Sequence, residues 1–337
     1  MSQEQQVFGW ESVIGQNQLT DNLQNALKFN KISHAYMIQG EKLSGKRMIA
    51  DIFARALQCE SEGERPCNQC RSCKQAMNGN HPDIIYVEHD KPNVISVDNI
   101  RTQINGDIAI KPYSGPHKIY IMDEAEKMNK AAQNALLKTI EEPPHYAIIF
   151  LLTTNAAGFL PTILSRCVTL ELKPISADII RKELMEHHNM PDYQADVCAQ
   201  FAQGNLGKAI KLASSEEFNE MKSHMTSLMR RMEKMDVFGI SQAVKELEEY
   251  KPKIGDYLDL MNIWFRDVLL YKATGDERKI TFQDEKMIIK RQASECSYHG
   301  LNTIIQAENT ARRRIACNGN YNLAVELMLL SIKENIA

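Results

Sequence analysis

The sequence lacks any apolar run near the roughly 20 residues that a membrane-spanning helix requires. Residues 1–10 are polar and lack both the basic start and the apolar stretch of a secretory signal peptide. We therefore expect a cytoplasmic protein without a membrane partner. An excess of one charge is also missing, because the formal net charge is -3. This balance excludes nucleic-acid binding over the whole surface and leaves room only for a local basic face.

A chain of 337 residues is too long for one compact core, and its pattern changes part-way along. In the first half, short apolar runs alternate with helical patterns, which predicts an α/β fold with a parallel, doubly wound sheet. The expected strands are 35–39, 84–87, 118–122, 147–153 and 169–172, and the expected helices include 46–57, 98–104 and 130–140. Beyond residue 174 the pattern is helical throughout. A break near Ser214 divides that part, so we expect three domains, 1–174, 175–214 and 215–337.

Residues 40–47 fit the phosphate-loop pattern G-x-x-x-x-G-K and lie between an expected strand and an expected helix. Gly40 and Gly45 would let backbone N–H groups curl around phosphates, and Lys46 would reach the outer phosphates. The next position should carry a Ser or Thr hydroxyl that holds Mg²⁺, but it is Arg47. Arginine cannot ligate a metal ion, and its charge would compete with Mg²⁺. The sequence predicts a degenerate nucleotide site with poor hydrolysis and leaves open whether ATP and Mg²⁺ still bind.

Asp123 and Glu124 follow the apolar run 118–122. In a phosphate-loop fold, the Asp would hold the Mg²⁺ water shell and the Glu would polarise the attacking water. Taken alone, the pair could instead cap the next helix. Their place after a phosphate loop favours descent from a nucleotide site, although activity does not follow without the hydroxyl ligand.

Four of the eight cysteines form a C-x7-C-x2-C-x2-C cluster, namely Cys59, Cys67, Cys70 and Cys73. Thiolates at this spacing can close a tetrahedral zinc site. The segment between them is polar and has little apolar surface with which to order itself, so a metal would supply its fold. An iron–sulfur cluster could use the same ligands, but nothing else in the sequence points to redox chemistry. We predict a structural zinc module over residues 59–73.

Six short motifs occur together in the first half of the chain. They are Gly15-Gln16, His34-Ala35-Tyr36, the cysteine cluster, Asp123-Glu124-Ala125-Glu126, residues 134–144 ending in Glu-Glu-Pro-Pro, and Ser165-Arg166-Cys167. In combination they resemble the bacterial clamp-loader family of AAA+ proteins, strongly over residues 8–174 and more weakly near the C-terminus. The resemblance implies a RecA-like AAA+ domain with a zinc module, a small helical lid and an all-α collar domain that joins the loader ring.

The resemblance also implies roles for individual residues. In this family the gamma/tau motor subunit hydrolyses ATP, whereas another subunit has a degenerate site. Arg47 favours the second kind, and so does Gly207, which stands where the motor carries an arginine that senses the γ-phosphate. By likeness, Arg166 would be an arginine finger that acts in trans on a neighbouring motor subunit, and Arg101 would lie near the DNA backbone. For Arg166 the alternative is an ordinary surface or salt-bridged arginine, and for Arg101 it is a solvated helix arginine.

Taken together, the resemblance implies a non-motor (stator) subunit of the DNA polymerase III holoenzyme without catalysis of its own. Such a subunit would bind the gamma/tau and delta subunits and help to load the sliding clamp onto primed DNA during replication, with indirect or weak contact to the clamp itself. The alternative is an ATP-hydrolysing, gamma/tau-like motor subunit. A standalone zinc and nucleic-acid-binding module is disfavoured because the phosphate-loop architecture spans far more of the chain.

Overall fold

The computed structural model describes residues 9–89, 94–317 and 319–336. The chain divides into two compact units, Met1–Ile175 and Ser176–Ala337, and each is described by itself. Residues 1–8 and 337 belong to the predicted first and third domains but lie outside the described residues. The further division of the second unit near Ser214 stays a prediction.

The first unit is built on a five-stranded parallel sheet with strand order β2-β3-β4-β1-β5. The strands are β1 Ala35–Gln39, β2 Ile84–Tyr86, β3 Lys118–Met122, β4 Ala147–Thr153 and β5 Val168–Glu171. β1 lies between two neighbours, with Ala35 opposite Ile149 of β4 and Tyr36 opposite Val168 of β5. The expected α/β fold is therefore confirmed, and each expected strand is present to within one residue at either end.

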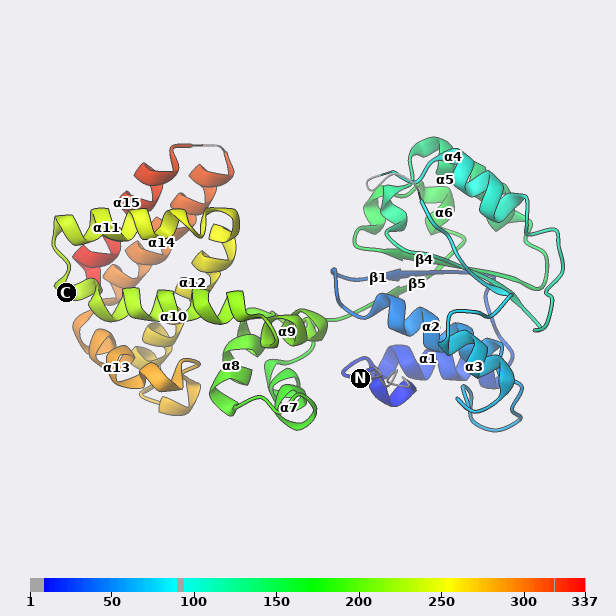
Figure 1. Cartoon of the computed structure of the whole chain (residues 1–337), viewed down its shortest axis with the longest axis horizontal. Helices are drawn as coiled ribbons and strands as arrows, with labels where there is room; N and C mark the ends of the chain where they lie inside the picture. Colours follow the sequence, from blue (N-terminus) through cyan, green and yellow to red (C-terminus); the bar gives the residue numbers. More distant parts are fainter. Residues whose placement is uncertain (1–8, 90–93, 318, 337) are drawn as a thin grey trace. The chain divides into compact units, whose positions relative to one another are not determined.

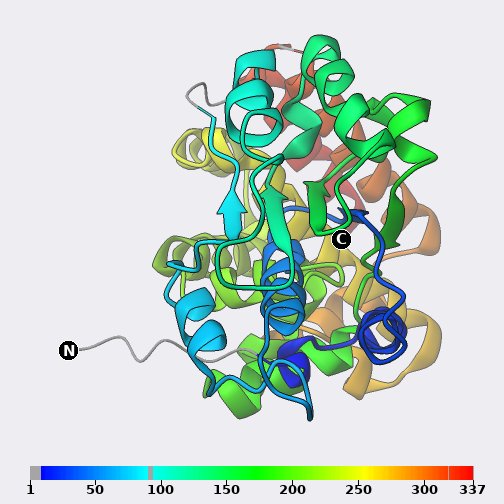
Figure 2. The same ribbon diagram turned by 90° about the vertical axis from the view of Figure 1, so that its right-hand side faces the viewer.

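Helices cover both faces of this sheet (Figures 1 and 2). On one face lie α1 Asn17–Lys28, α2 Lys46–Leu57 and α3 Arg71–Met77, and on the other lie α4 Val97–Ile100, α5 Lys130–Glu141 and α6 Pro161–Leu164. Side chains of β1 alternate between the two layers, since Met37 belongs to the same apolar cluster as Leu136 of α5 whereas Ile38 belongs to the cluster of Phe53 of α2. The three central strands β1, β3 and β4 are thus buried on both sides, which explains their largely apolar sequences.

The second unit is helical throughout its described residues (Figure 1). Its helices are α7 Ala177–His187, α8 Asp192–Phe201, α9 Leu206–Ala213, α10 Glu216–Arg231, α11 Val237–Glu248, α12 Ile254–Thr274, α13 Lys286–Glu295, α14 Tyr298–Ala316 and α15 Tyr321–Ile336. Capping residues fix several helix starts, as where Ser215 accepts a hydrogen bond from the N–H of Phe218. The fully buried Trp264 donates to Gln292 Oε1 at 2.8 Å, so its polar atom is satisfied inside the core. None of the described helices could cross a bilayer.

Glu308 of α14 is a buried acid, with only 3% of its surface exposed. Neither of its carboxylate oxygens has a hydrogen-bond partner among the described residues. Burial raises the pKa of Glu308 to about 8, although the nearby Arg312 guanidinium opposes this shift. The pKa of an unfolded glutamate is about 4.3. The unfolded chain therefore loses this proton first as pH rises, and the fold loses stability progressively from about pH 4.5 to about pH 8.

We expect Glu308→Gln to raise the free energy of unfolding by on the order of 3 kcal/mol at about pH 8, because the amide stays neutral. The gain should shrink towards about pH 5, where the native carboxyl group is protonated anyway. Urea unfolding at the two pH values measures this difference. Glu334→Gln, which neutralises an exposed acid of α15, is the matched control. A gain that does not depend on pH would contradict the assignment of a neutral Glu308.

Candidate functional site

The phosphate loop joins β1 to α2, with Gly45 as the residue before the helix. Gly45 has a φ of 91°, a left-handed conformation that glycine adopts at little cost. Lys46 is buried at the first position of α2. Its Nζ donates hydrogen bonds to the carbonyl oxygens of Gly40 at 2.7 Å and Glu41 at 2.6 Å. The ammonium group therefore lies against the first two residues of the loop.

Arg47 packs on the neighbouring strand β2. Its guanidinium carbon lies 3.9 Å from the centre of the Tyr86 ring, within cation–π range. Its Nε lies 3.3 Å from Asp51 Oδ1, one helical turn further along α2. The Tyr86 hydroxyl donates to the same carboxylate oxygen at 3.0 Å. The charge of Arg47 is thus engaged by Asp51 and Tyr86, and position 47 offers no hydroxyl to a metal ion.

The acidic end of β3 faces the phosphate loop. Asp123 accepts a hydrogen bond from the N–H of Glu124 at 2.9 Å, and Glu124 has a left-handed φ of 47°. Glu126 accepts from Thr154 Oγ1 at 2.7 Å, and such hydrogen bonds lower the pKa of Glu126 against the opposing effect of burial. Burial lowers the pKa of Lys46, while the charges of Asp123, Glu126 and Glu124 oppose that shift. The structure therefore brings these acids into the electrostatic environment of the loop lysine.

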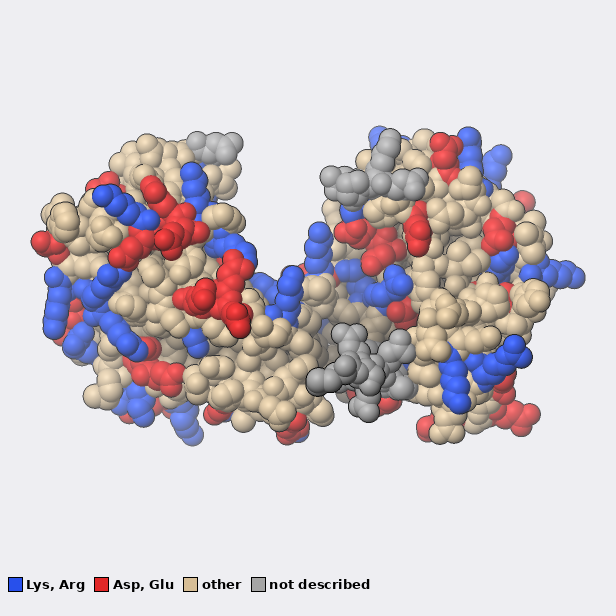
Figure 3. Space-filling model, in the orientation of Figure 1, with Lys and Arg blue, Asp and Glu red and all other residues tan. Residues whose placement is uncertain are grey.

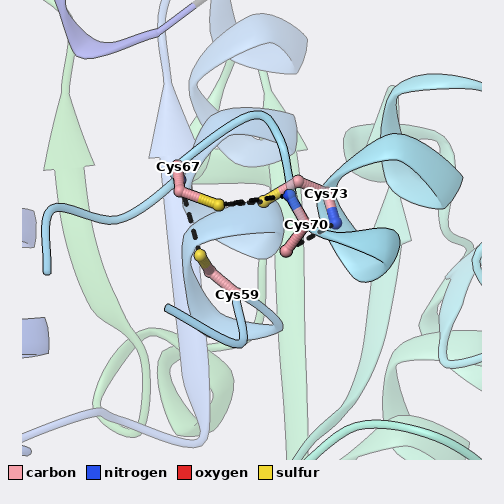
Figure 4. A group of neighbouring side chains, drawn as sticks. All are labelled: Cys59, Cys67, Cys70 and Cys73. Atoms are coloured by element: carbon pink, nitrogen blue, oxygen red, sulfur yellow. Dashed lines mark hydrogen bonds between the residues drawn. The ribbon is translucent and has the colours of Figure 1, made fainter. Parts of the chain in front are cut away.

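Of the four clustered cysteines, Cys59 and Cys67 lie between α2 and α3, Cys70 caps the start of α3, and Cys73 lies in its first turn (Figure 4). Their Sγ atoms all lie within 4.8 Å of one another. Backbone N–H groups point at the sulfurs, since Cys67 N lies 3.4 Å from Cys59 Sγ and Cys73 N lies 3.3 Å from Cys70 Sγ. The N–H groups of Gln69 and Cys70 lower the pKa of the Cys67 thiol to about 6, whereas burial raises the pKa of the Cys59 and Cys73 thiols. Such donors stabilise thiolates, the form that binds metal.

This sulfur arrangement fits a four-coordinate metal ion. A zinc–sulfur bond of about 2.3 Å places tetrahedral ligand sulfurs about 3.8 Å apart. The Sγ atoms of Cys67 and Cys73 are 4.0 Å apart. The cluster could therefore hold one metal ion, and four thiolates would leave no coordination position open for catalysis.

Arg166 follows α6 and lies beside the end of α5. Its Nη2 is 3.1 Å from Glu141 Oε1, and its Nη1 donates to the carbonyl oxygen of Thr162 at 3.0 Å. The side chain is 40% exposed. The Ser-Arg-Cys and Glu-Glu-Pro-Pro motifs, which are separate in the sequence, thus meet at the surface through this ion pair.

Arg101 is exposed at the start of a π-helical turn, Arg101–Asn105, that continues α4. The N–H of Gly106 closes this turn by donating to the Arg101 carbonyl at 2.8 Å. Such turns inside helices occur frequently at functional sites. On the face drawn in Figure 3, basic and acidic side chains are interspersed over both units, in keeping with the net charge of -3. Arg101 is accessible, but its role as a DNA contact rests on the family resemblance.

Helix α9 carries the position where the motor subunits are expected to have a γ-phosphate-sensing arginine. Gly207 stands there, and Asn205 caps the helix by accepting from the N–H of Lys208 at 3.0 Å. The Lys208 ammonium lies 4.7 Å from the centre of the Phe201 ring and 3.4 Å from the Phe201 carbonyl oxygen. Lys208 thus contacts Phe201 of its own unit, so this lysine does not replace the arginine that is missing at position 207.

Comparison with known proteins decides the family. The family described as "DNA polymerase III, delta subunit" matches residues 15–176, and "DNA polymerase III, delta subunit, C terminal" matches residues 215–334. The DNA polymerase III subunit delta' of Bacillus subtilis (strain 168) is 30% identical over 316 residues, covering 93% of this chain and 94% of that protein. The chain belongs to the delta' family of the DNA polymerase III clamp loader. Both the α/β unit and the helical unit take part in this match.

The chain is also similar to other DNA polymerase III subunits. The DNA polymerase III subunit tau of Bacillus subtilis (strain 168) is 31% identical over 286 residues, which cover 78% of this chain but 50% of tau. A solved structure of a DNA polymerase III gamma subunit-related protein from Thermotoga maritima is similar at a TM-score of 0.42 and 19% identity. That similarity covers 94% of this chain and 99% of the solved chain.

Two partners of the site arginines were not predicted from sequence. Asp51 pairs with Arg47, and their spacing of one helical turn could have indicated it. Glu141 pairs with Arg166, but no spacing rule connects the end of one helix with a loop beyond the next strand. Only the fold brings those two residues together.

Proposed function

We propose that this chain is the non-motor (stator) subunit of the clamp loader, with no ATP hydrolysis of its own. The observation that carries this proposal is the packing of Arg47 on Tyr86 and its pairing with Asp51. A cation fixed at this position supplies no oxygen ligand, so Mg²⁺ lacks the hydroxyl that normal hydrolysis requires. The loop then serves mainly as scaffold between β1 and α2.

Arg166 is the residue through which the chain would contribute to ATP hydrolysis. Its guanidinium is partly exposed at the surface, where a neighbouring gamma/tau subunit could present its nucleotide. A planar guanidinium can donate two parallel hydrogen bonds to phosphate oxygens and offset the charge of the transition state. Arginine fingers that act in trans raise rates by roughly 10³- to 10⁵-fold.

The other parts of the chain would have structural and binding roles within the loader. We propose that Cys59, Cys67, Cys70 and Cys73 bind a structural zinc ion, which supplies order to a polar segment. Residues 175–214 would form the lid and residues 215–337 the collar that joins the ring with the gamma/tau and delta subunits. Arg101 would contact the DNA backbone, without sequence preference, when the loader encloses primed DNA. Contact with the sliding clamp would be indirect or weak.

The alternative function is an ATP-hydrolysing motor subunit, which the similarity to tau favours. An ATPase assay on the isolated chain distinguishes the two proposals. We expect no turnover above background, and the same result for Lys46→Ala, because the Mg²⁺ ligand is already missing. Isothermal titration with Mg²⁺-ATP would report separately whether nucleotide still binds. Turnover that Lys46→Ala abolishes would contradict the stator proposal and favour the motor.

A further inference from the structure

The guanidinium group of Arg166 is held by protein acceptors at both of its terminal nitrogens. Nη2 lies 3.1 Å from Glu141 Oε1, while Nη1 donates to the Thr162 carbonyl at 3.0 Å and to Ser165 Oγ at 3.3 Å. These are the nitrogens with which an arginine would grip a phosphate group bidentately. Nη1 and Nη2 can therefore both bind a phosphate group only if their present contacts with the protein are broken.

The place of Glu141 in its helix is unfavourable for the helix alone. Glu141 is the last residue of α5, and Pro143 and Pro144 follow shortly after it. A carboxylate in the last turn lies beside the negative end of the helix dipole and destabilises the helix end. The ion pair with Arg166 offsets that repulsion. The position of Glu141 is thus explained by its partner better than by the stability of α5.

The ion pair between Arg166 and Glu141 is weak enough to form and break reversibly. Both side chains are partly exposed, 40% for Arg166 and 43% for Glu141. Exposed ion pairs contribute up to about fivefold to an equilibrium, the equivalent of about 1 kcal/mol. A triphosphate carries several negative charges and can displace one carboxylate at this modest cost. The ion pair is strong enough to favour the position of the guanidinium beside Glu141, and weak enough for a triphosphate to displace Glu141.

We propose that Glu141 is a latch for Arg166, a positioning residue that holds the guanidinium on its own subunit until a neighbouring subunit's nucleotide displaces it. This inference rests on the proposed role of Arg166 in trans. If only a fraction of the molecules is in the state that can bind a ligand, the apparent affinity for that ligand is reduced by the same fraction. The latch therefore raises the ATP concentration that the neighbouring site needs, and leaves the rate at saturating ATP unchanged.

The test uses the reconstituted loader and measures the ATP dependence of hydrolysis. We expect Glu141→Gln to lower the KM for ATP by up to about fivefold with an unchanged kcat, because the amide no longer holds the guanidinium by charge. Glu142→Gln removes the same charge one residue further along and should leave the KM as in the wild-type loader. Thermal melting of both variants checks that the fold of the first unit is kept.

Failure of this inference can be separated from failure of the proposed function. The double variant Glu141→Gln/Arg166→Ala should behave as Arg166→Ala alone, because the latch acts only through the arginine. If Arg166→Ala reduces hydrolysis but Glu141→Gln leaves the KM unchanged or lowers kcat, the latch is wrong and the finger stands. If Arg166→Ala has no effect on hydrolysis, both proposals are overturned.

Discussion

Replacing Arg166 with alanine should nearly abolish ATP hydrolysis at the one motor site that faces it, by roughly 10³-fold or more. The reason is electrostatic, because the guanidinium would offset charge that develops on the transferring phosphoryl group. Single-turnover hydrolysis in the reconstituted loader measures the effect. The phase that belongs to this site should disappear, while sites served by other subunits continue to turn over. An unchanged time course would reject Arg166 as a finger.

Arg166→Lys is the informative companion to this change. Lysine keeps the positive charge but lacks the rigid planar fork that matches phosphate oxygens. We therefore expect it to recover only a small part of the lost rate. Size-exclusion chromatography should show intact loader assembly for both variants, since Arg166 is a partly exposed side chain that follows α6. Loss of assembly would indicate a structural role for Arg166 instead.

The second large effect concerns the cysteine cluster. Cys73 is fully buried and is one of the four gathered sulfurs. Cys73→Ser should lower the zinc content from one ion per chain to near zero under competition with a chelator. The loss should exceed the roughly 10- to 100-fold effects of changing outer-shell partners, because a direct ligand is removed. The midpoint of thermal unfolding of the first unit should fall as well, since metal binding would order the segment.

Elemental analysis of the purified chain measures this effect and identifies the metal. Cys317→Ser is the matched control, because Cys317 is exposed and lies outside the cluster. It should keep its full zinc content. Iron with visible charge-transfer absorption would contradict the zinc assignment and favour the iron–sulfur alternative. Retention of zinc by Cys73→Ser would contradict the four-ligand site.

The sheet could be predicted from sequence because its strands carry a strong signal. Every residue of β4 is buried, so the strand reads as an unbroken apolar run. The helix expected over 98–104 was only partly correct. It is α-helical to Ile100 and continues as a π-helical turn over Arg101–Asn105. Hydrophobic spacing over a single turn cannot distinguish the two hydrogen-bond patterns.

The sequence identified residues of the candidate site better than it identified their partners. The missing hydroxyl at position 47 is evident in the sequence, but the stacking of Arg47 on Tyr86 depends on β2 lying beside α2. The ion pair between Arg166 and Glu141 similarly depends on the contact of α6 with α5. Contacts between elements distant in the sequence follow from the sheet order, which composition and spacing do not specify.

The central claim is that this chain contributes to ATP hydrolysis in its neighbour's site and not in its own. The most direct measurement compares Lys46→Ala with Arg166→Ala in the reconstituted loader, scored by the rate of clamp loading onto primed DNA. We predict that Lys46→Ala loads the clamp at the wild-type rate, whereas Arg166→Ala loads it at least about tenfold more slowly, because a finger is worth roughly 10³-fold or more at its site. Failure of Lys46→Ala with normal loading by Arg166→Ala would contradict the account.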